Sequence, residues 1–193
     1  MIQNVYQTHI SLKNSKPRIW RRLLIPSDLL LSDFNKIIQT SMGWTNSHLH
    51  QFIKDNIFYM PKNPDDDLWY EFNNVDYGEI RISELLEYEN DKIEYEYDFG
   101  DGWMHEIKLE KILPPERNIG LPVCLKGKMN CPPEDCGGLG GGYNMLEILK
   151  DPDHEEYESY LEWLGEGYDP EYFNIEEINE LLKQDNFGCI EFL

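Results

Sequence analysis

The sequence predicts an α+β fold: an N-terminal, mostly antiparallel sheet with one amphipathic helix, then a Pro/Gly/Cys-rich loop and a C-terminal helical segment. Three observations support this order. Apolar residues alternate with polar ones in several stretches of residues 1–112, five prolines and seven glycines fall in residues 113–142, and helical spacing dominates residues 143–193. We expect a single domain over residues 1–193, because a chain of 193 residues with 40% apolar content can bury one core.

The first third of the chain is predicted to hold two strands and a helix. Residues 5–12 alternate in polarity, a turn follows, and residues 19–25 form a second strand that ends at Pro26. Apolar residues then recur at intervals of three and four over residues 34–42, which predicts an amphipathic helix closed by Gly43.

The strongest local pattern lies in residues 92–112. Apolar and charged side chains alternate strictly through residues 92–99, a Gly-Asp-Gly turn occupies residues 100–102, and the alternation then resumes. The pattern predicts a long hairpin with one aromatic face, and the period of two places His105 on that face.

The segments before this hairpin are less regular. Residues 49–59 are predicted to form a strand or a hairpin, residues 61–78 an exposed polar loop, and residues 82–86 a short helical turn.

Three helices are predicted in the last third of the chain. The first spans residues 143–150, the second begins at Asp153 with Glu156 at capping-box spacing, and the third begins at Asn174 with Glu177 at the same offset.

Residues 113–142 are expected to lack regular helix or strand because of their proline and glycine content. Their last six residues, GGLGGG at 137–142, lack the Lys-Ser/Thr of a phosphate-binding loop. We interpret this run as a flexible entry to the following helix, with an anion-binding nest as the alternative.

The chain is strongly acidic, with 17 Lys and Arg against 37 Asp and Glu and a net charge of −20. Nucleic acids and anionic membranes are also negative, so this charge argues against general binding to either, and protein partners are expected instead. The sequence leaves the oligomeric state open. One basic segment stands out, and its members are Lys13, Lys16, Arg18, Arg21 and Arg22. It is either a weak candidate for nucleic-acid binding or, as we prefer, a hairpin whose bases face the acidic remainder of the molecule.

The N-terminal residues MIQNVYQTHI do not have the basic-then-apolar pattern of a signal peptide. No apolar run reaches the roughly eighteen residues of a spanning helix. We therefore expect a cytoplasmic protein, in which structural disulfides are disfavoured.

The cysteines Cys124, Cys131 and Cys136 lie in the irregular loop, and Cys189 lies near the C-terminus. The spacing of the first three is not the paired C-x2-C of a zinc ribbon, yet three thiols and a histidine could hold zinc and order the loop. The alternative is that they are small buried apolar side chains or free thiols.

The histidines His48 and His50 form an H-x-H pair, which on a strand would share one face. If His105 joins them, the three form a candidate site for zinc or another divalent metal. The alternative is a polar strand edge whose histidines bond to the backbone.

Four carboxylates are candidates for catalysis in the same region: Asp98, Asp101, Glu134 and Asp135. The first two crowd the hairpin turn, and the other two lie in the CPPEDC segment. They could act as a general base or as metal ligands if the histidines converge there, although Asp101 between two glycines is also an ordinary turn former.

Several of these segments together resemble a known family, the plasmid pRiA4b ORF-3-like family. The matching segments are PRIWRRLLIP at 17–26, SMGW at 41–44, SHLHQF at 47–52, YEYDFGDGWMHEIKLEKIL at 95–113, CLKGKMNCPPEDCGG at 124–138 and DPDHEEYESYLEWLGEGYDPEYFN at 151–174. One departure is Asn35, at a position where the family pattern often has histidine.

The resemblance implies a small protein of bacteria or archaea, associated with plasmids or transposons and without an assigned activity. It favours an accessory or interaction protein without catalysis. A metal-dependent, hydrolase-like enzyme built on the His/Asp cluster is the first alternative, and a nucleic-acid-binding accessory protein is the second.

Overall fold

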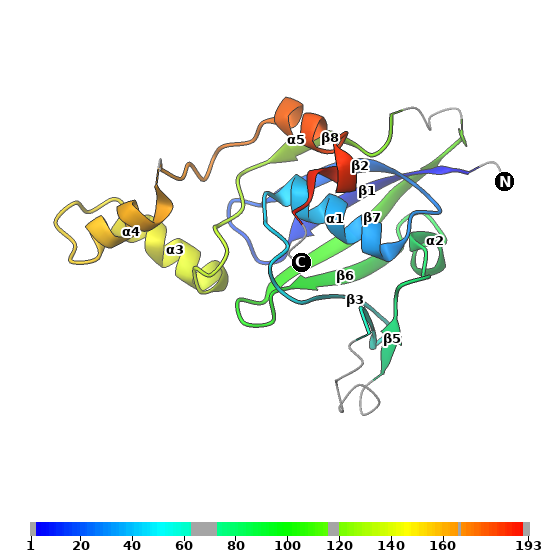
Figure 1. The fold of residues 1–193 in the computed structure, drawn as a ribbon, viewed down its shortest axis with the longest axis horizontal. Helices are drawn as coiled ribbons and strands as arrows, with labels where there is room; N and C mark the ends of the chain where they lie inside the picture. The colour runs from blue at the N-terminus through cyan, green and yellow to red at the C-terminus, as the bar shows by residue number, and fades with distance from the viewer. Residues whose placement is uncertain (1–2, 63–72, 116–119, 166, 191–193) are drawn as a thin grey trace.

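The computed structural model describes residues 3–62, 73–115, 120–165 and 167–190. Its strands are β1 Val5–Leu12, β2 Trp20–Pro26, β3 His50–Lys54, β4 Ile57–Met60, β5 Asn74–Asp76, β6 Lys92–Tyr97, β7 Trp103–Leu113 and β8 Val123–Lys128. They form one sheet in the order β5-β4-β3-β6-β7-β1-β2-β8. Neighbouring strands are antiparallel, except that β4 and β5 run parallel. The fold is therefore α+β with a mixed, mostly antiparallel sheet (Figure 1).

The helices are α1 Leu31–Met42, α2 Ile82–Leu85, α3 Gly138–Ile148, α4 Tyr157–Leu164 and α5 Ile175–Leu181, followed by the 3-10 helix η3 Asp185–Gly188. Helix α1 crosses one face of the sheet, and α5 and η3 lie near it, whereas α3 and α4 extend to one side as an arm (Figure 1). No helix among the residues described has both the length and the apolar character that a membrane span requires.

The core lies between α1 and the aromatic face of the sheet. Phe34 of α1 stacks on Phe52 of β3, and the hydroxyl of Tyr95 on β6 donates to the side chain of Asn35 at 2.6 Å. Along β7, buried and half-buried residues alternate from Trp103 to Leu109. This alternation leaves the opposite face of the sheet to charged side chains, as is common for antiparallel sheets.

Most predicted elements are confirmed. The first two strands and the hairpin of β6 and β7 form where the period-two pattern placed them. Helix α1 ends at Gly43, whose positive φ of 91° explains the glycine, and residues 49–59 form the β3–β4 hairpin. Residues 63–72 of the predicted 61–78 loop lie outside the described residues; within the remainder, Asn74–Asp76 form β5 beside β4, so the loop prediction is wrong there.

The prediction that residues 113–142 lack regular structure is wrong in two places, over Val123–Lys128 and from Gly138 onward. Strand β8 pairs with β2, so a short stretch between prolines has a strand partner that the composition did not indicate. In the second place the glycine run forms the start of α3 rather than a flexible entry. A Cβ on Gly138 would overlap the carbonyl oxygen of Asp101, and one on Gly141 would overlap that of Cys136, so close packing requires these glycines.

Of the two predicted helix starts with capping-box spacing, one is confirmed and the other is wrong. Helix α5 begins after Asn174, whose side chain accepts hydrogen bonds from the amides of Glu176 and Glu177 as a capping residue does. Helix α4 begins four residues later than predicted, at Tyr157, and Glu156 provides no side-chain cap. The residues before it form turns, so the capping box assigned to Asp153 is wrong.

Candidate metal centre

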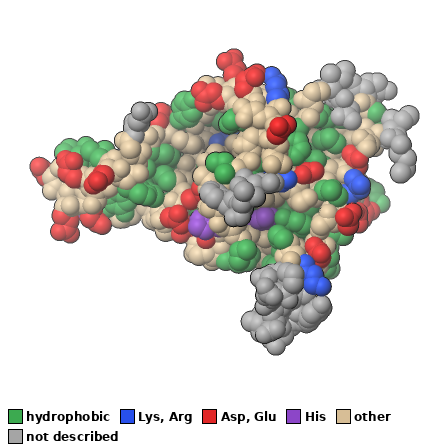
Figure 2. Space-filling view, viewed as in Figure 1, with side chains coloured by type: hydrophobic (Ala, Val, Ile, Leu, Met, Phe, Trp, Pro, Cys, Tyr) green, Lys and Arg blue, Asp and Glu red, His purple; other side chains and the backbone are tan. Residues whose placement is uncertain are grey.

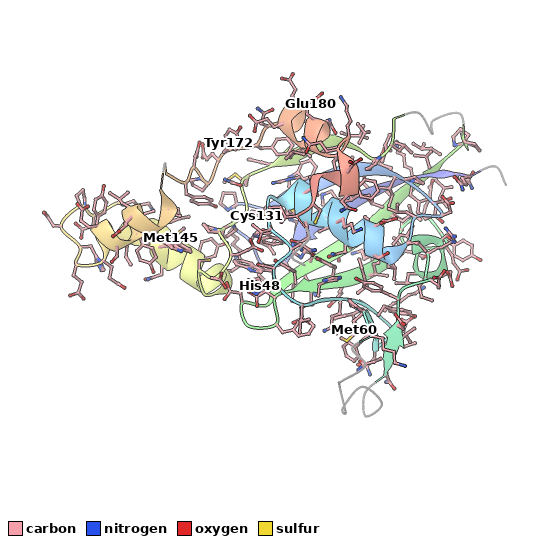
Figure 3. All side chains as sticks on the ribbon, viewed as in Figure 1. His48, Met60, Cys131, Met145, Tyr172 and Glu180 are labelled. Carbon is pink, nitrogen blue, oxygen red and sulfur yellow. The ribbon has the colours of Figure 1, made fainter. Side chains whose placement is uncertain are left out.

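Three segments that are far apart in the sequence meet at the root of the arm: residues 44–49 after α1, the turn 98–102 between β6 and β7, and the loop 131–138 before α3. His48 belongs to the first segment and lies beside the start of α3 (Figure 3). The buried Trp44 anchors this segment, because its ring packs on Trp103 and its indole N–H donates to the carbonyl of Pro132 at 3.0 Å.

The hairpin turn fixes Asp98 beside this segment. The amide of Asp98 donates to the carbonyl of Leu49 at 2.8 Å, and its Oδ1 accepts from the amide of Gly100 at 2.9 Å. Asp98 has a positive φ of 56°, which a short polar side chain tolerates. Its Oδ2 lies 3.7 Å from Nε2 of His48, and the residue is only 8% exposed.

The loop 131–138 completes the cluster with Asp135, whose Oδ1 lies 3.4 Å from Nε2 of His48. The side chain of Asp135 is 73% exposed, so one side of the cluster faces solvent. The loop docks on the hairpin turn because the amide of Gly137 donates to Oδ2 of Asp101 at 3.2 Å.

One ligand atom from each of His48, Asp98 and Asp135 lies within 4.8 Å of the other two, which makes the trio the single candidate metal-binding group among the described residues. The Nε2 atom of His48 is buried and has no hydrogen-bond partner there. The two carboxylate oxygens are too distant for good hydrogen bonds to it, and in the tautomer that carries its proton on Nδ1 the lone pair of Nε2 faces them. A cation between the three atoms would remove this conflict.

The other two histidines of the predicted trio have different partners. Nε2 of His50 lies 2.5 Å from the hydroxyl of Tyr77, and Nδ1 of His105 lies 3.4 Å from the carbonyl oxygen of Tyr95. Burial lowers the pKa of both His50 and His105 to about 4, so both are neutral at pH 7. Neither joins His48 in a ligand group within the described part of the chain.

The candidate carboxylates divide between ligand and support positions. Glu134 accepts from the amide of Thr45 at 3.0 Å, from the Thr45 hydroxyl at 2.7 Å and from the hydroxyl of Tyr97. These bonds tie the loop 131–138 to the segment carrying His48. Asp101 likewise holds the loop through Gly137, so Glu134 and Asp101 position the cluster, whereas Asp98 and Asp135 face the histidine.

The four cysteines are free thiols. Cys131 is buried with its sulfur 3.6 Å from that of Met42, and Cys124 is buried in β8. Burial raises the pKa of Cys131 and of Cys136 to about 11, so both stay protonated at pH 7 without a metal. The cysteines contribute to no candidate ligand group among the residues that the structure places.

Three of the five basic side chains form hydrogen bonds or ion pairs with backbone or acidic groups of the same molecule. Arg21 is buried and donates to the carbonyls of Ser41 and Lys128, Arg22 binds both carboxylate oxygens of Glu110, and Lys13 pairs with Glu94 at 2.7 Å. Lys16 and Arg18 are exposed.

The sequence did not single out several residues that build the site. Trp44, Thr45, Ser47 and Tyr97 hold the two sides together through Pro132 and Glu134. Trp44, Ser47 and Tyr97 lie in segments that carry the family resemblance, but no role was predicted for them, because the docking of residues 131–138 is a tertiary contact.

Three comparisons place the chain among known proteins. The family model described as plasmid pRiA4b ORF-3-like protein matches residues 4–177. An uncharacterized protein, y4hQ, of Sinorhizobium fredii is 35% identical over 183 residues, which cover 93% of this chain and 91% of that protein. The crystal structure of a protein of unknown function from Methanosarcina mazei Go1 has a TM-score of 0.80 and 36% identity, and the match covers 92% of this chain and 98% of that one.

Proposed function

We propose, from the premise that this chain belongs to the plasmid pRiA4b ORF-3-like family, that it binds a zinc-class divalent ion through His48, Asp98 and Asp135 and uses the ion in hydrolysis. The relatives are described without an activity, so the proposal rests on the site alone. The observation that carries it is the buried Nε2 atom of His48, which lacks a hydrogen-bond partner in the described chain and faces two carboxylate oxygens.

The spacing of the ligand atoms is compatible with a zinc-class ion, and the imidazole favours one. In a tetrahedral site the ligand atoms are about 1.63 bond lengths apart, which is roughly 3.3–3.6 Å for bonds of roughly 2.0–2.2 Å. The two separations from Nε2 of His48 are 3.4 and 3.7 Å, close to that range. Calcium and magnesium prefer oxygen ligands alone, so the imidazole favours zinc or a similar transition metal.

The exposed side of the cluster supports a reactive rather than a closed site. Three protein ligands leave at least one coordination position, and Asp135 lies at the solvent edge. When bound, a zinc-class ion supplies a hydroxide equivalent near neutral pH. The amide of Gly100 holds the carboxylate of Asp98, and the ring of Tyr97 packs against that of His48. These two ligands would therefore bind an ion without a large rearrangement.

Metal binding is tested by titrating metal-free protein with zinc in a calorimeter and by counting zinc per chain after dialysis. We expect one equivalent in the wild type, its loss in His48→Ala, and its retention in His154→Ala, a matched histidine before α4. Retention in His48→Ala combined with loss in Cys131→Ser would instead place the ion on the cysteines and contradict the proposal.

The hydrolytic part is tested with two general substrates, p-nitrophenyl acetate and bis(p-nitrophenyl) phosphate. We expect zinc-dependent turnover of at least one of them by the wild type, and a loss of about a hundredfold or more in His48→Ala. Equal rates for the wild type and His48→Ala on both substrates would contradict the hydrolytic part of the proposal. Only the metal-binding part would then stand.

A second candidate function is that of an accessory or interaction protein, supported by the exposed apolar side chains of α4. None of the residues of α4 is buried, and Leu161 and Trp163 are 38% and 47% exposed. Figure 2 shows hydrophobic side chains along the arm with acidic ones at its tip. Such a surface suits a protein partner with basic residues around an apolar anchor.

The interaction candidate is tested by comparing the proteins retained by the wild type with those retained by Leu161→Glu/Trp163→Glu. A partner that the variant loses while its zinc content stays unchanged would support it. Binding of the same partners by both proteins would contradict a role for α4. The nucleic-acid candidate has the least support, because only Lys16 and Arg18 of the basic segment are exposed.

A further inference from the structure

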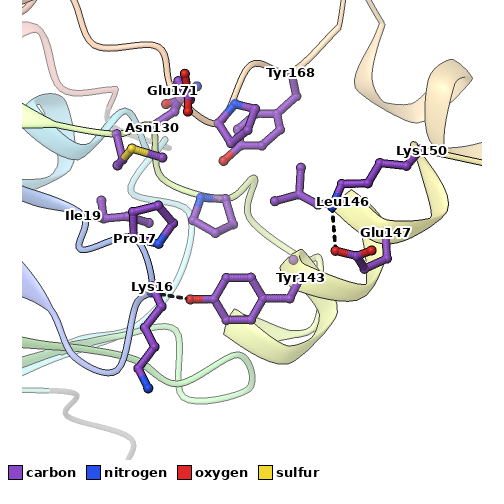
Figure 4. A pocket seen from close by; sticks show the side chains of 14 residues that line it. Lys16, Pro17, Ile19, Asn130, Tyr143, Leu146, Glu147, Lys150, Tyr168 and Glu171 are labelled. Carbon is purple, nitrogen blue, oxygen red and sulfur yellow. Dashed lines mark hydrogen bonds and ion pairs between the residues drawn. The ribbon is translucent and has the colours of Figure 1, made fainter.

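A cavity of about 450 Å³ lies between the root of the arm and the turn before β2. Figure 4 shows Tyr168 and Tyr143 on opposite sides of it, Pro17 on a third side and Leu146 of α3 on a fourth. This volume falls in the range of small-molecule sites. The hydroxyl of Tyr143 accepts a hydrogen bond of 2.6 Å from the amide of Lys16, which fixes one wall against the other.

The walls of the cavity are mostly apolar and flat. Three prolines and two tyrosines contribute rigid faces, and aliphatic side chains fill the spaces between them; these residues are Pro17, Pro132, Pro170, Tyr143, Tyr168, Ile19, Met129 and Leu146. Rigid flat walls favour a planar ring over a flexible chain, because aromatic faces stack on one another and on proline.

The hydroxyl of Tyr168 is a polar group that the cavity leaves available to a ligand. The hydroxyl of Tyr168 points toward the interior and makes no hydrogen bond within the described residues (Figure 4). Burial raises the pKa of Tyr168, so the hydroxyl stays protonated and can donate as well as accept. Tyr168 is half-buried and its hydroxyl is within reach of water, so a ligand group that bonds to this hydroxyl takes the place of water there.

The charges around the cavity do not select an ion. Two lysines and two glutamates line it, and Lys150 pairs with Glu147 at 2.7 Å. The chain as a whole carries a net charge of −20, which disfavours an anionic ligand.

We infer that this cavity binds an uncharged, flat-ring molecule with one hydrogen-bonding group that meets the hydroxyl of Tyr168. The inference does not rest on the metal centre, since no residue of the cavity belongs to the ligand trio. Pro132 is nevertheless part of the loop that carries Asp135, so a ligand in the cavity would contact the other side of the same loop.

The probe for this inference is N-phenyl-1-naphthylamine, an uncharged fluorescent molecule with two ring systems and one N–H group. We expect one equivalent to bind to the metal-free wild type. Its anionic analogue 8-anilino-1-naphthalenesulfonate adds a sulfonate to the same skeleton, and we expect at least about fivefold weaker binding because of the acidic surroundings. Equal or tighter binding of the sulfonate would overturn the assignment to an uncharged ligand.

The site is located with matched variants. Leu146→Trp fills the cavity and should abolish binding of the uncharged probe, whereas Leu161→Trp on α4 adds the same ring outside it and should leave binding unchanged. Tyr168→Phe removes only the hydroxyl and should weaken binding roughly two- to tenfold. Probe binding to Leu146→Trp with wild-type affinity would overturn the inference. If Leu146→Trp does not fold, wild-type affinity in Tyr168→Phe would overturn it instead.

Discussion

The sheet with α1 and the arm formed by α3 and α4 differ in what holds them in place. In the sheet, Trp103 is fully buried among aromatic neighbours, whereas Trp163 on α4 is 47% exposed and α4 has no buried residue. The sheet is therefore held by packing, and α4 largely by its connection to α3. The candidate metal centre lies at the boundary, where residues 131–138 lead from the sheet to the arm. The comparison indicates that stability resides mainly in the sheet and α1, and little of it in α4.

The largest expected effect compares the two tryptophans directly. Trp103→Ala should lower the free energy of unfolding by about 3–5 kcal/mol, because it empties a packed core position. Trp163→Ala should change it by less than about 0.5 kcal/mol. Urea unfolding monitored by circular dichroism measures both, and similar losses would show that the arm is as well packed as the sheet.

The second-largest expected effect is a loss of folding stability at acidic pH, caused by two buried histidines of the sheet. The folded-state pKa of His50 and of His105 is about 4, below the ordinary value of 6.5, so the unfolded chain takes up protons first. Their contribution to stability is complete above pH 6.5 and is lost as the pH falls toward 4. At pH 5 the expected loss is about 2 kcal/mol for each histidine.

Unfolding of the wild type, His105→Gln and His154→Gln at pH 8 and pH 5 tests this expectation. Removal of His105 should reduce the loss between the two pH values, and removal of His154, which lies between α3 and α4, should not. An identical pH dependence in His105→Gln and the wild type would contradict the pKa assigned to His105.

The docking of the loop on the hairpin turn should show an intermediate effect. Gly138→Ala would place a Cβ against the carbonyl of Asp101 at a positive φ of 67°, and we expect a loss of about 1–3 kcal/mol. Gly140→Ala meets nothing within 4 Å and should be neutral or slightly stabilising in a helix. Zinc affinity should fall in the first variant alone. Unchanged zinc affinity in Gly138→Ala would show that metal binding does not depend on the contact between the loop and the hairpin turn.

The smallest effect concerns ion pairs in the two regions. Arg22 and Glu110 on the sheet form a two-bond pair with partly buried side chains, so a double-mutant cycle should give a coupling of about 0.5–1 kcal/mol. Lys150 and Glu147 on the arm are both more than two thirds exposed, and their coupling should not be measurable. Equal couplings would weaken the distinction between the regions.

Local patterns predicted the sheet-forming half of the molecule well. The alternation in residues 5–12 and 92–109 follows the burial of one sheet face, and a helical period combined with Gly43 defined α1. These signals are local because each element packs one side against the same core. Even the burial of His105 followed from the period of two.

The elements that the sequence did not predict depend on distant partners. Strand β8 forms because β2 offers an unpaired edge, and the glycines of α3 fit the carbonyls of Asp101 and Cys136. The predicted H-x-H pair did not account for the fact that His48 precedes β3 and His50 lies within it, so the two side chains have different partners. Asp98 and Asp135 were both candidates, but only the tertiary fold brings them to His48.

The central claim is that His48, Asp98 and Asp135 form one metal centre at the root of the arm. Anomalous diffraction at the zinc absorption edge, from crystals of the zinc-loaded protein, tests it most directly. We predict one strong peak about 2.0–2.2 Å from Nε2 of His48 and from one oxygen of each aspartate. A peak beside the cysteines of residues 124–136 or between His50 and Tyr77, with none at His48, would contradict the account.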